Sequence, residues 1–113
     1  MKIVFFGDSI TEGCFELSFH NAEGATDIIR DKKSVYHNVL KERIEKEHPG
    51  LDIEYVNAGI SGNSSADAIK RMERDVISQK PDAAVVCFGL NDVAGMSADV
   101  YASNMEYGRY VAN

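Results

Sequence analysis

The chain lacks a long hydrophobic segment, because its longest apolar stretches have the length of strands and fall well short of a bilayer span. Its first residues lack the basic segment and apolar core of a secretion signal. No basic stripe is present either, and the formal net charge is -6 with both signs interspersed. Such a surface has little with which to replace the counterions of a phosphate backbone. We therefore expect a cytoplasmic protein that binds neither membranes nor nucleic acid.

Cysteine is also scarce. The two present, Cys14 and Cys87, lie far apart and form no Cys-x-x-Cys pair, which fits a reducing compartment with free thiols. Cys87 lies within an apolar run and is interpreted as an inert core thiol. Histidine and cysteine form no cluster at metal-ligand spacing, and the glycines form no dinucleotide or phosphate pattern. No metal or cofactor is therefore expected.

The apolar residues that are present suffice for one domain, since 113 residues are too few for two independent cores. Three apolar, β-branched runs predict strands at 2–6, 52–56 and 83–88. The last run is continuous enough to be buried on both faces of a sheet. Between and after these runs, apolar residues at helical spacing predict helices over 34–48, 65–80 and 98–111. The alternation predicts right-handed crossovers and a parallel sheet covered by helices.

Two helix starts and one long connection complete this outline. Ser34 is a plausible cap for the first helix, and Ser64-x-x-Asp67 resembles a capping box for the second. Residues 14–33 fit neither the strand nor the helix period and make an unusually long connection between a strand and its helix. Long loops in compact domains are usually functional or disordered. We expect this segment to be a loop or lid over the neighbouring serine turn.

Each predicted strand ends in a loop of similar chemistry. The first loop is Gly7-Asp8-Ser9, the second spans 57–63, and the third spans 89–92. Parallel strands bring these loops to one edge of the sheet, where ligands of open α/β sheets bind. The loops supply a hydroxyl, a glycine whose N–H can approach a ligand, and an amide side chain. These are the groups that an acyl-transfer site requires as nucleophile and oxyanion donors.

These residues closely resemble the SGNH, or GDSL-like, family of serine esterases and lipases. The resemblance rests on three blocks in order: Gly7, Asp8, Ser9 and Gly13; Ile60, Ser61 and Gly62; and Asn91. It implies that Ser9 is the nucleophile and that the Ser9 N–H, the Gly62 N–H and the Asn91 side chain bind the oxyanion. Asp8 is interpreted as an organiser of the serine turn, and Asp92 as a residue that holds its loop through local backbone bonds.

The resemblance also implies a fold and a substrate class. The fold is a three-layer α/β/α arrangement with a parallel, flavodoxin-like sheet. Residues 1–113 form one such domain, truncated after about three strands and incomplete at the C-terminus. The implied activity is hydrolysis of small carboxylic esters through an acyl-enzyme at Ser9, with acetyl esters of carbohydrates as plausible substrates because the family often handles them.

One family element is absent from the sequence. The family's last block supplies Asp-x-x-His, in which the histidine is the general base and the aspartate orients it. No such motif follows Asn91, so we expect either a fragment or a shortened protein, inactive or impaired by itself. His37, in the first turn of its helix, and His20, in the long loop, are weak candidates for the base. His48 falls at the far end of its helix and is excluded.

Other interpretations stay open beside the esterase. Ser9 could simply cap a short helix, and the chain could be a catalytically incomplete half-domain that serves as a binding or assembly module. A flavodoxin-like or receiver-like domain shares the alternating elements, although neither needs the Gly62 and Asn91 loops. If the third strand borders missing strands, its edge is uncovered. We then expect self-association through that edge or by swapping of the last helix.

Overall fold

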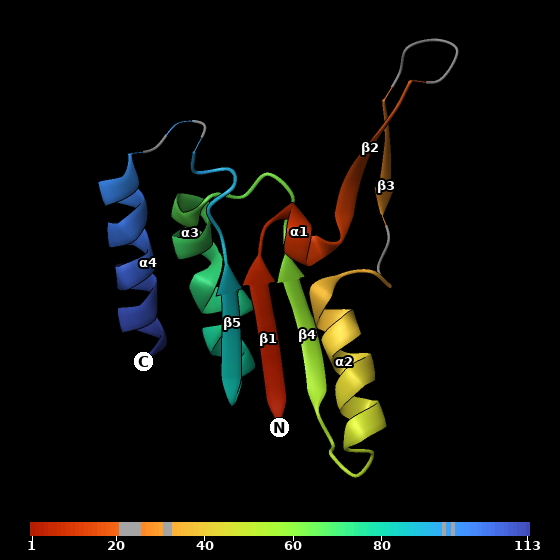
Figure 1. Cartoon of the computed structure of the whole chain (residues 1–113). Helices are drawn as coiled ribbons and strands as arrows, with labels where there is room; N and C mark the ends of the chain where they lie inside the picture. Colours follow the sequence, from red (N-terminus) through yellow and green to blue (C-terminus); the bar gives the residue numbers. More distant parts are fainter. Residues whose placement is uncertain (21–25, 31–32, 94, 96) are drawn as a thin grey trace.

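The computed structural model describes residues 1–113 except 21–25, 31–32, 94 and 96, and for 14–20, 26–30 and 112 it describes the backbone alone. Three strands form a parallel sheet in the order β4-β1-β5 (Figure 1). The strands are β1 (Lys2–Gly7), β4 (Glu54–Gly59) and β5 (Ala83–Cys87). In register, Gly7 lies opposite both Gly59 and Cys87, so the three strands end at one level. The loops that follow them open on one edge of the sheet, as predicted.

Helices lie on both faces of this sheet. Phe5 points to one face and packs against Tyr36 and His37 of α2 (Tyr36–Glu47). Val4 and Phe6 point to the other face, because successive side chains of a strand alternate. There they form the core with α3 (Ser65–Asp75), and α4 (Ala98–Ala112) lies on the outer side of α3 (Figure 1). The predicted three-layer α/β/α arrangement around a short parallel sheet is confirmed.

The main core cluster lies between the sheet and α3. Its fully buried or nearly buried members are Val4, Phe6, Ala68, Met72, Val76 and Phe88. The rings of Phe6 and Phe88 meet edge to face with centroids 5.1 Å apart. This cluster packs α3 against β1. The polar side chains of α3 therefore lie within reach of the end of β1 and the loop that follows it.

Of the two predicted helix caps, the structure confirms one. Ser64 and Asp67 form the full capping box, with the Ser64 N–H donating to the Asp67 carboxylate at 3.0 Å. The helix over 34–48 begins later than predicted, because Val35 is its N-cap and makes no side-chain cap bond. The helix over 65–80 is split: α3 ends at Asp75, and a 3-10 turn, η1 (Ile77–Gln79), completes it.

The segment 14–33 is not the structureless loop that was predicted. After the short helix α1 (Ser9–Glu12), the backbone forms β2 (Cys14–His20) and β3 (Thr26–Arg30), paired antiparallel as a separate two-stranded sheet (Figure 1). The sequence carried the signal, because Phe15, Leu17 and Phe19 alternate with polar residues at the period of a strand. Whether this sheet acts as a lid stays a prediction.

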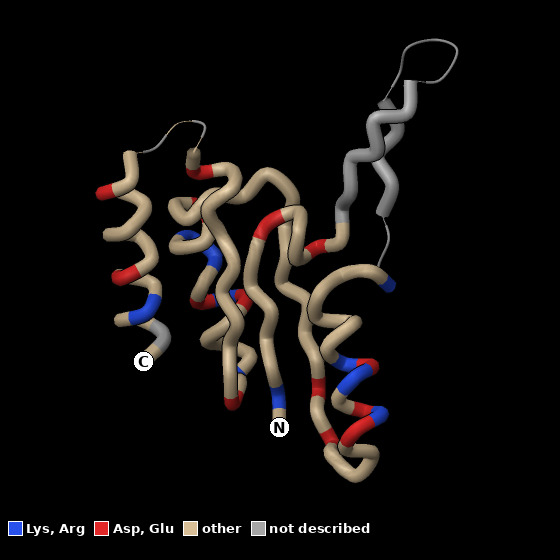
Figure 2. Tube along the Cα trace, in the orientation of Figure 1, with Lys and Arg blue, Asp and Glu red and all other residues tan. Residues whose placement is uncertain are grey.

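The prediction that the third strand is buried on both faces of the sheet is wrong. Val85 and Val86 of β5 are 40% and 41% exposed, and β5 is an edge strand of the sheet. A groove of about 940 Å³ lies between β5, α3 and α4, with Met72, Val86 and Phe88 among its lining residues. Figure 2 shows no charged residue along the strand itself. An uncharged, apolar edge of this kind favours pairing with another chain.

We propose that the chain self-associates through β5, and Val86→Lys tests this. A lysine on the apolar face of β5 should shift the protein toward monomer in light scattering at increasing concentration, because it places a charge in the contact. Val39→Lys is the matched control, since Val39 is 52% exposed on α2, away from β5. A strictly monomeric unmodified chain at high concentration would contradict the proposal.

Candidate active site

The serine turn follows the central strand directly. Ser9 is the first residue of α1 and is half-buried. The Asp8 carboxylate, which is 2% exposed, caps this short helix by accepting a hydrogen bond from the Ile10 N–H at 3.0 Å. The Gly13 N–H closes the turn on the Ser9 carbonyl at 2.9 Å. Asp8 therefore organises the turn that carries Ser9, as interpreted from the sequence.

The loop between β4 and α3 is fastened to the serine turn. A Cβ at Gly59 would lie 2.2 Å from the Glu12 backbone nitrogen, so only glycine allows β4 to end this close to α1. The Glu12 carboxylate accepts hydrogen bonds from the Ser61 N–H, at 2.9 Å, and from the Ser61 hydroxyl. The Ile60 N–H donates to the Gly7 carbonyl at 3.0 Å. These contacts hold the residues before Gly62 beside the turn of Ser9.

Gly62 itself adopts a conformation that favours glycine. Its φ is 81°, in the left-handed region, whereas a Cβ there would meet no atom within 4 Å. The requirement for glycine is therefore conformational, and the space around this exposed residue is open. An N–H in such a loop can be approached by a ligand without obstruction from a side chain of its own.

The loop after β5 is tied to the same region. The Asn91 side-chain amide donates to the Asn63 carbonyl at 2.9 Å, so Asn91 lies beside the residue that follows Gly62. The Asp92 backbone takes part in the expected local turn, since its N–H donates to the Gly89 carbonyl at 3.1 Å, but its side chain binds outside this loop. Its buried carboxylate accepts from the Ser65 N–H at 2.9 Å and from the Ser65 hydroxyl at 2.5 Å. Asp92 thus joins the third loop to the first turn of α3.

The three predicted oxyanion donors therefore lie on loops that the structure joins to one another. Ser9 and Gly62 are connected through the contact of Glu12 with Ser61, and Gly62 and Asn91 through Asn63. An amide nitrogen carries two hydrogens, so the bond from Asn91 to Asn63 leaves one hydrogen for a further acceptor. Chemically, the edge offers a hydroxyl and neutral N–H donors, which suit an oxygen that becomes negative during reaction.

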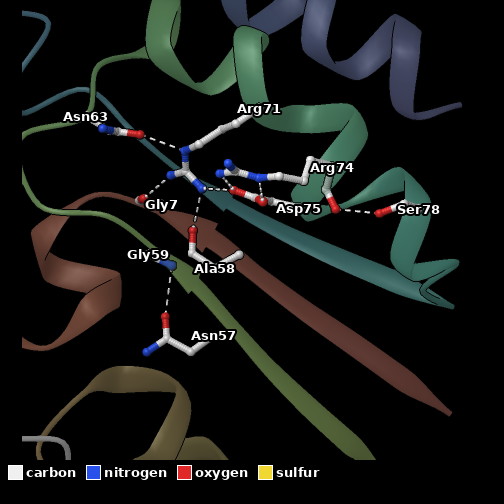
Figure 3. A network of polar contacts seen from close by, with 9 residues as sticks. All are labelled: Gly7, Asn57, Ala58, Gly59, Asn63, Arg71, Arg74, Asp75 and Ser78. Atoms are coloured by element: carbon white, nitrogen blue, oxygen red, sulfur yellow. Dashed lines mark hydrogen bonds and ion pairs between the residues drawn. The ribbon is translucent and has the colours of Figure 1, made fainter.

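Arg71 is the residue of this region that the sequence did not reveal. It lies in the middle of α3 and is only 7% exposed. Figure 3 shows its guanidinium between the ends of β1 and β4. Its Nη2 donates to the Gly7 carbonyl at 2.8 Å, its Nη1 to the Ala58 carbonyl at 2.8 Å, and its Nε to the Asn63 side-chain oxygen at 2.6 Å.

The charge of Arg71 is compensated within the network. Nη1 also donates to the Asp75 carboxylate at 2.9 Å, and the guanidinium carbon lies 4.4 Å from the centre of the Phe6 ring. Arg74 donates to the same carboxylate, and this bond, together with that from Arg71, holds the pKa of Asp75 below its usual value. A carboxylate that stays ionised keeps the buried guanidinium paired.

Burial shapes the ionisation of two other groups close to the site. Burial raises the pKa of the Cys87 thiol, and the Asp8 charge adds to this effect. The thiol therefore stays protonated at neutral pH. Cys87 is only partly buried and is not a member of the core cluster, so it is not the core thiol that was expected. Burial also raises the pKa of Tyr36, whose hydroxyl lies 3.1 Å from that of Thr11. In the part of the chain with described side chains, no three His, Cys, Asp or Glu residues gather as a metal site requires.

The histidines that were candidates for the base have different outcomes. His37 is 4% exposed, and its ring packs against Phe5 with centroids 5.0 Å apart. Its Nε2 lies 2.8 Å from the Thr11 carbonyl, which can only accept, so this nitrogen carries the hydrogen. The structure thus gives His37 a role in the core. The side chain of His20 lies outside the described residues.

Comparison with known proteins assigns the family. Residues 5–112 match the GDSL-like lipase/acylhydrolase family, so the chain belongs to it. An acetylxylan esterase of Geobacillus stearothermophilus is 39% identical over 92 residues, which cover 81% of this chain and 40% of that enzyme. An uncharacterized lipoprotein of Bacillus subtilis (strain 168) is 37% identical over 94 residues, covering 81% of this chain and 32% of the lipoprotein.

Solved structures agree with this assignment. A lipase/acylhydrolase from Enterococcus faecalis superposes with a TM-score of 0.73 at 29% identity, over 99% of this chain and 52% of that one. A catalytic mutant of an acetylxylan esterase from G. stearothermophilus, with a histidine replaced by alanine, gives a TM-score of 0.73 at 32% identity. That match covers 95% of this chain and 52% of the esterase. The chain therefore spans about half the length of its solved relatives.

The core role of His37 is tested by substitution. His37→Ala should lower the free energy of unfolding by roughly 2–4 kcal/mol, because it removes a buried ring and its hydrogen bond. His37→Gln should cost less, since its amide nitrogen can still donate to Thr11. Urea unfolding measures both, with His48→Gln, at the exposed end of α2, as the control. Equal stability of His37→Ala and the unmodified chain would disprove the role.

Proposed function

We propose that this chain carries the nucleophile and the oxyanion donors of a serine ester hydrolase that forms an acyl-enzyme at Ser9. The observation that supports this most is the joining of three loops at the carboxyl edge of the sheet. Glu12 binds the loop of Gly62, and Asn91 binds the residue that follows it. Membership of the GDSL-like family supports the same reaction class.

In the proposed reaction, the Ser9 hydroxyl oxygen attacks the carbonyl carbon of the ester while its proton passes to a base. The carbonyl oxygen becomes an oxyanion, which accepts hydrogen bonds from the N–H groups of Ser9 and Gly62 and from the Asn91 amide. Collapse of this intermediate breaks the bond to the alcohol oxygen, which takes the proton back from the base, and leaves an acyl group on Ser9. Water then releases the acid by the same route.

The proposed substrates are small carboxylic esters, including acetyl esters of carbohydrates. The support is the similarity to an acetylxylan esterase, whose name states its substrate. The edge itself offers exposed apolar side chains next to the motif residues: Ile10 is 44% exposed and Leu90 62% exposed. Such side chains suit a small, uncharged acyl group better than a charged one.

We propose that neither of the histidines with described side chains, His37 and His48, is the base. His37 is buried and bonded to Thr11, and His48 lies exposed at the far end of α2. The family resemblance implies a histidine from an Asp-x-x-His block. We therefore propose that the 113 residues react slowly by themselves and that a base supplied from outside accelerates them.

A catalytically incomplete half-domain that acts as a binding or assembly module is the second candidate. The exposed apolar face of β5 favours it, since such a face is suited to contact with another polypeptide. Reading the coding sequence downstream of Asn113 for Asp-x-x-His discriminates the two candidates. The motif favours the hydrolase, and its absence favours the module.

A cytoplasmic location is also a proposal. None of the described helices is both long and apolar enough to cross a membrane. One relative is named a lipoprotein, so attachment to a membrane is the alternative location. Fractionation of cells expressing the natural gene decides between the two locations.

The nucleophile is tested with a fluorophosphonate probe and mass spectrometry. The folded chain should be labelled at Ser9, slowly without and faster with added imidazole, because imidazole can accept the hydroxyl proton. Ser9→Ala should abolish this label. Ser103→Ala, an exposed serine of α4, is the matched control and should react like the unmodified chain. Labelling of other serines only, or none with imidazole present, would refute the assignment of Ser9.

A further inference from the structure

The guanidinium of Arg71 is linked to all three loops that carry the proposed chemistry. It binds the first two loops directly and the third through Asn63. Its Nη2 binds the carbonyl of Gly7, two residues before Ser9. Its Nε binds the side chain of Asn63, which directly follows Gly62. The backbone carbonyl of that same Asn63 accepts the hydrogen bond from Asn91. Figure 3 shows the first two of these contacts converging on one planar group.

The geometry of these contacts requires an arginine. The guanidinium is a rigid fork with five N–H donors, and Arg71 directs them to a strand end, a second strand end and a loop side chain at 2.6–2.8 Å. A lysine offers three donors from one atom and cannot reach acceptors that are spread around the edge of a planar group. The guanidinium carbon also lies 4.4 Å from the centre of the Phe6 ring, a cation–π contact that adds to its attachment.

We propose that Arg71 is a positioning residue that sets the placement of Ser9, Gly62 and Asn91 relative to one another. This inference rests on the proposed function. Arg71 touches no substrate in this account. It acts through Gly7 on the serine turn, and through Asn63 on both of the other oxyanion donors. A small displacement of such donors lowers a reaction rate far more than it lowers stability or binding.

The first test substitutes Arg71→Lys and compares it with Arg74→Lys. Arg74 is the matched control because it lies on the same helix and binds the same carboxylate, yet its side chain is 72% exposed and its hydrogen bonds go to Asp75. The rate constant of Ser9 phosphonylation at saturating probe, with imidazole present, should fall on the order of tenfold to a hundredfold in Arg71→Lys. The probe concentration at half-saturation should change little, and Arg74→Lys should stay close to the unmodified chain.

A purely structural role predicts a different pattern. If Arg71 only stabilised the fold, the substitution would lower the labelled fraction, while the molecules that stay folded would react with the original rate constant. An unchanged rate constant, whatever the labelled fraction, would overturn the proposal. The rate constant therefore separates positioning from stability within one experiment.

A second pair of variants keeps Arg71 in place, so it applies even if Arg71→Lys does not fold. Asn63→Ala removes only the acceptor of the Arg71 Nε, and the rate constant should fall. Asn63→Asp restores an oxygen at the same place, and its rate constant should lie closer to that of the unmodified chain. Equal rate constants for the two variants would also overturn the proposal.

A separate readout covers the case in which Ser9 of the unmodified chain is not labelled. That result contradicts the proposed function. The positioning role is then judged from the NMR signals of the Gly62 amide and the Asn91 side-chain amide in ¹⁵N-labelled protein. The chemical shifts of both signals should change in Arg71→Lys and in Asn63→Ala, and neither should change in Arg74→Lys. Unmoved signals in the first two variants would overturn the positioning role by themselves.

Discussion

The buried guanidinium of Arg71 is the interaction on which the geometry of the sheet's loop edge depends. Burying a charge is costly unless it is paired and its donors are satisfied. Here the Asp75 carboxylate pairs it, while two strand-end carbonyls and the Asn63 side chain accept its hydrogen bonds. The compensation is complete only when β1, β4 and the following loop are in register. The same contacts that make the buried charge tolerable therefore define the edge at which Ser9 lies.

Much of this architecture could be predicted from the sequence, because it depends on local patterns. Apolar runs marked the three strands, and their parallel order brought the three loops to one edge. The Ser64 and Asp67 capping box was readable because both partners lie within one helical turn. The hairpin of β2 and β3 was missed although Phe15, Leu17 and Phe19 alternate, since charges and a glycine within 14–33 suggested a loop.

The parts that could not be predicted depend on partners far apart in the sequence. Arg71 looks like an ordinary solvated residue of an amphipathic helix, and its acceptor at Gly7 lies 64 residues away. The Asp92 backbone forms the local turn that was expected, but its carboxylate binds Ser65, which is 27 residues earlier and which no local pattern reveals. His37 lies in the core because Phe5 and Thr11 meet it there, which no spacing within its own helix reveals.

Hydrogen exchange of the Arg71 guanidinium is the most direct test of whether this buried network holds the loop edge together. In NMR spectra of the ¹⁵N-labelled chain, we expect individually resolved, slowly exchanging Nη hydrogens for Arg71, with couplings across the hydrogen bonds to the Gly7 and Ala58 carbonyls. Arg74 serves as the internal reference for an exposed guanidinium. A single averaged and rapidly exchanging signal for Arg71, like that of Arg74, would show that these hydrogen bonds do not hold the guanidinium in place.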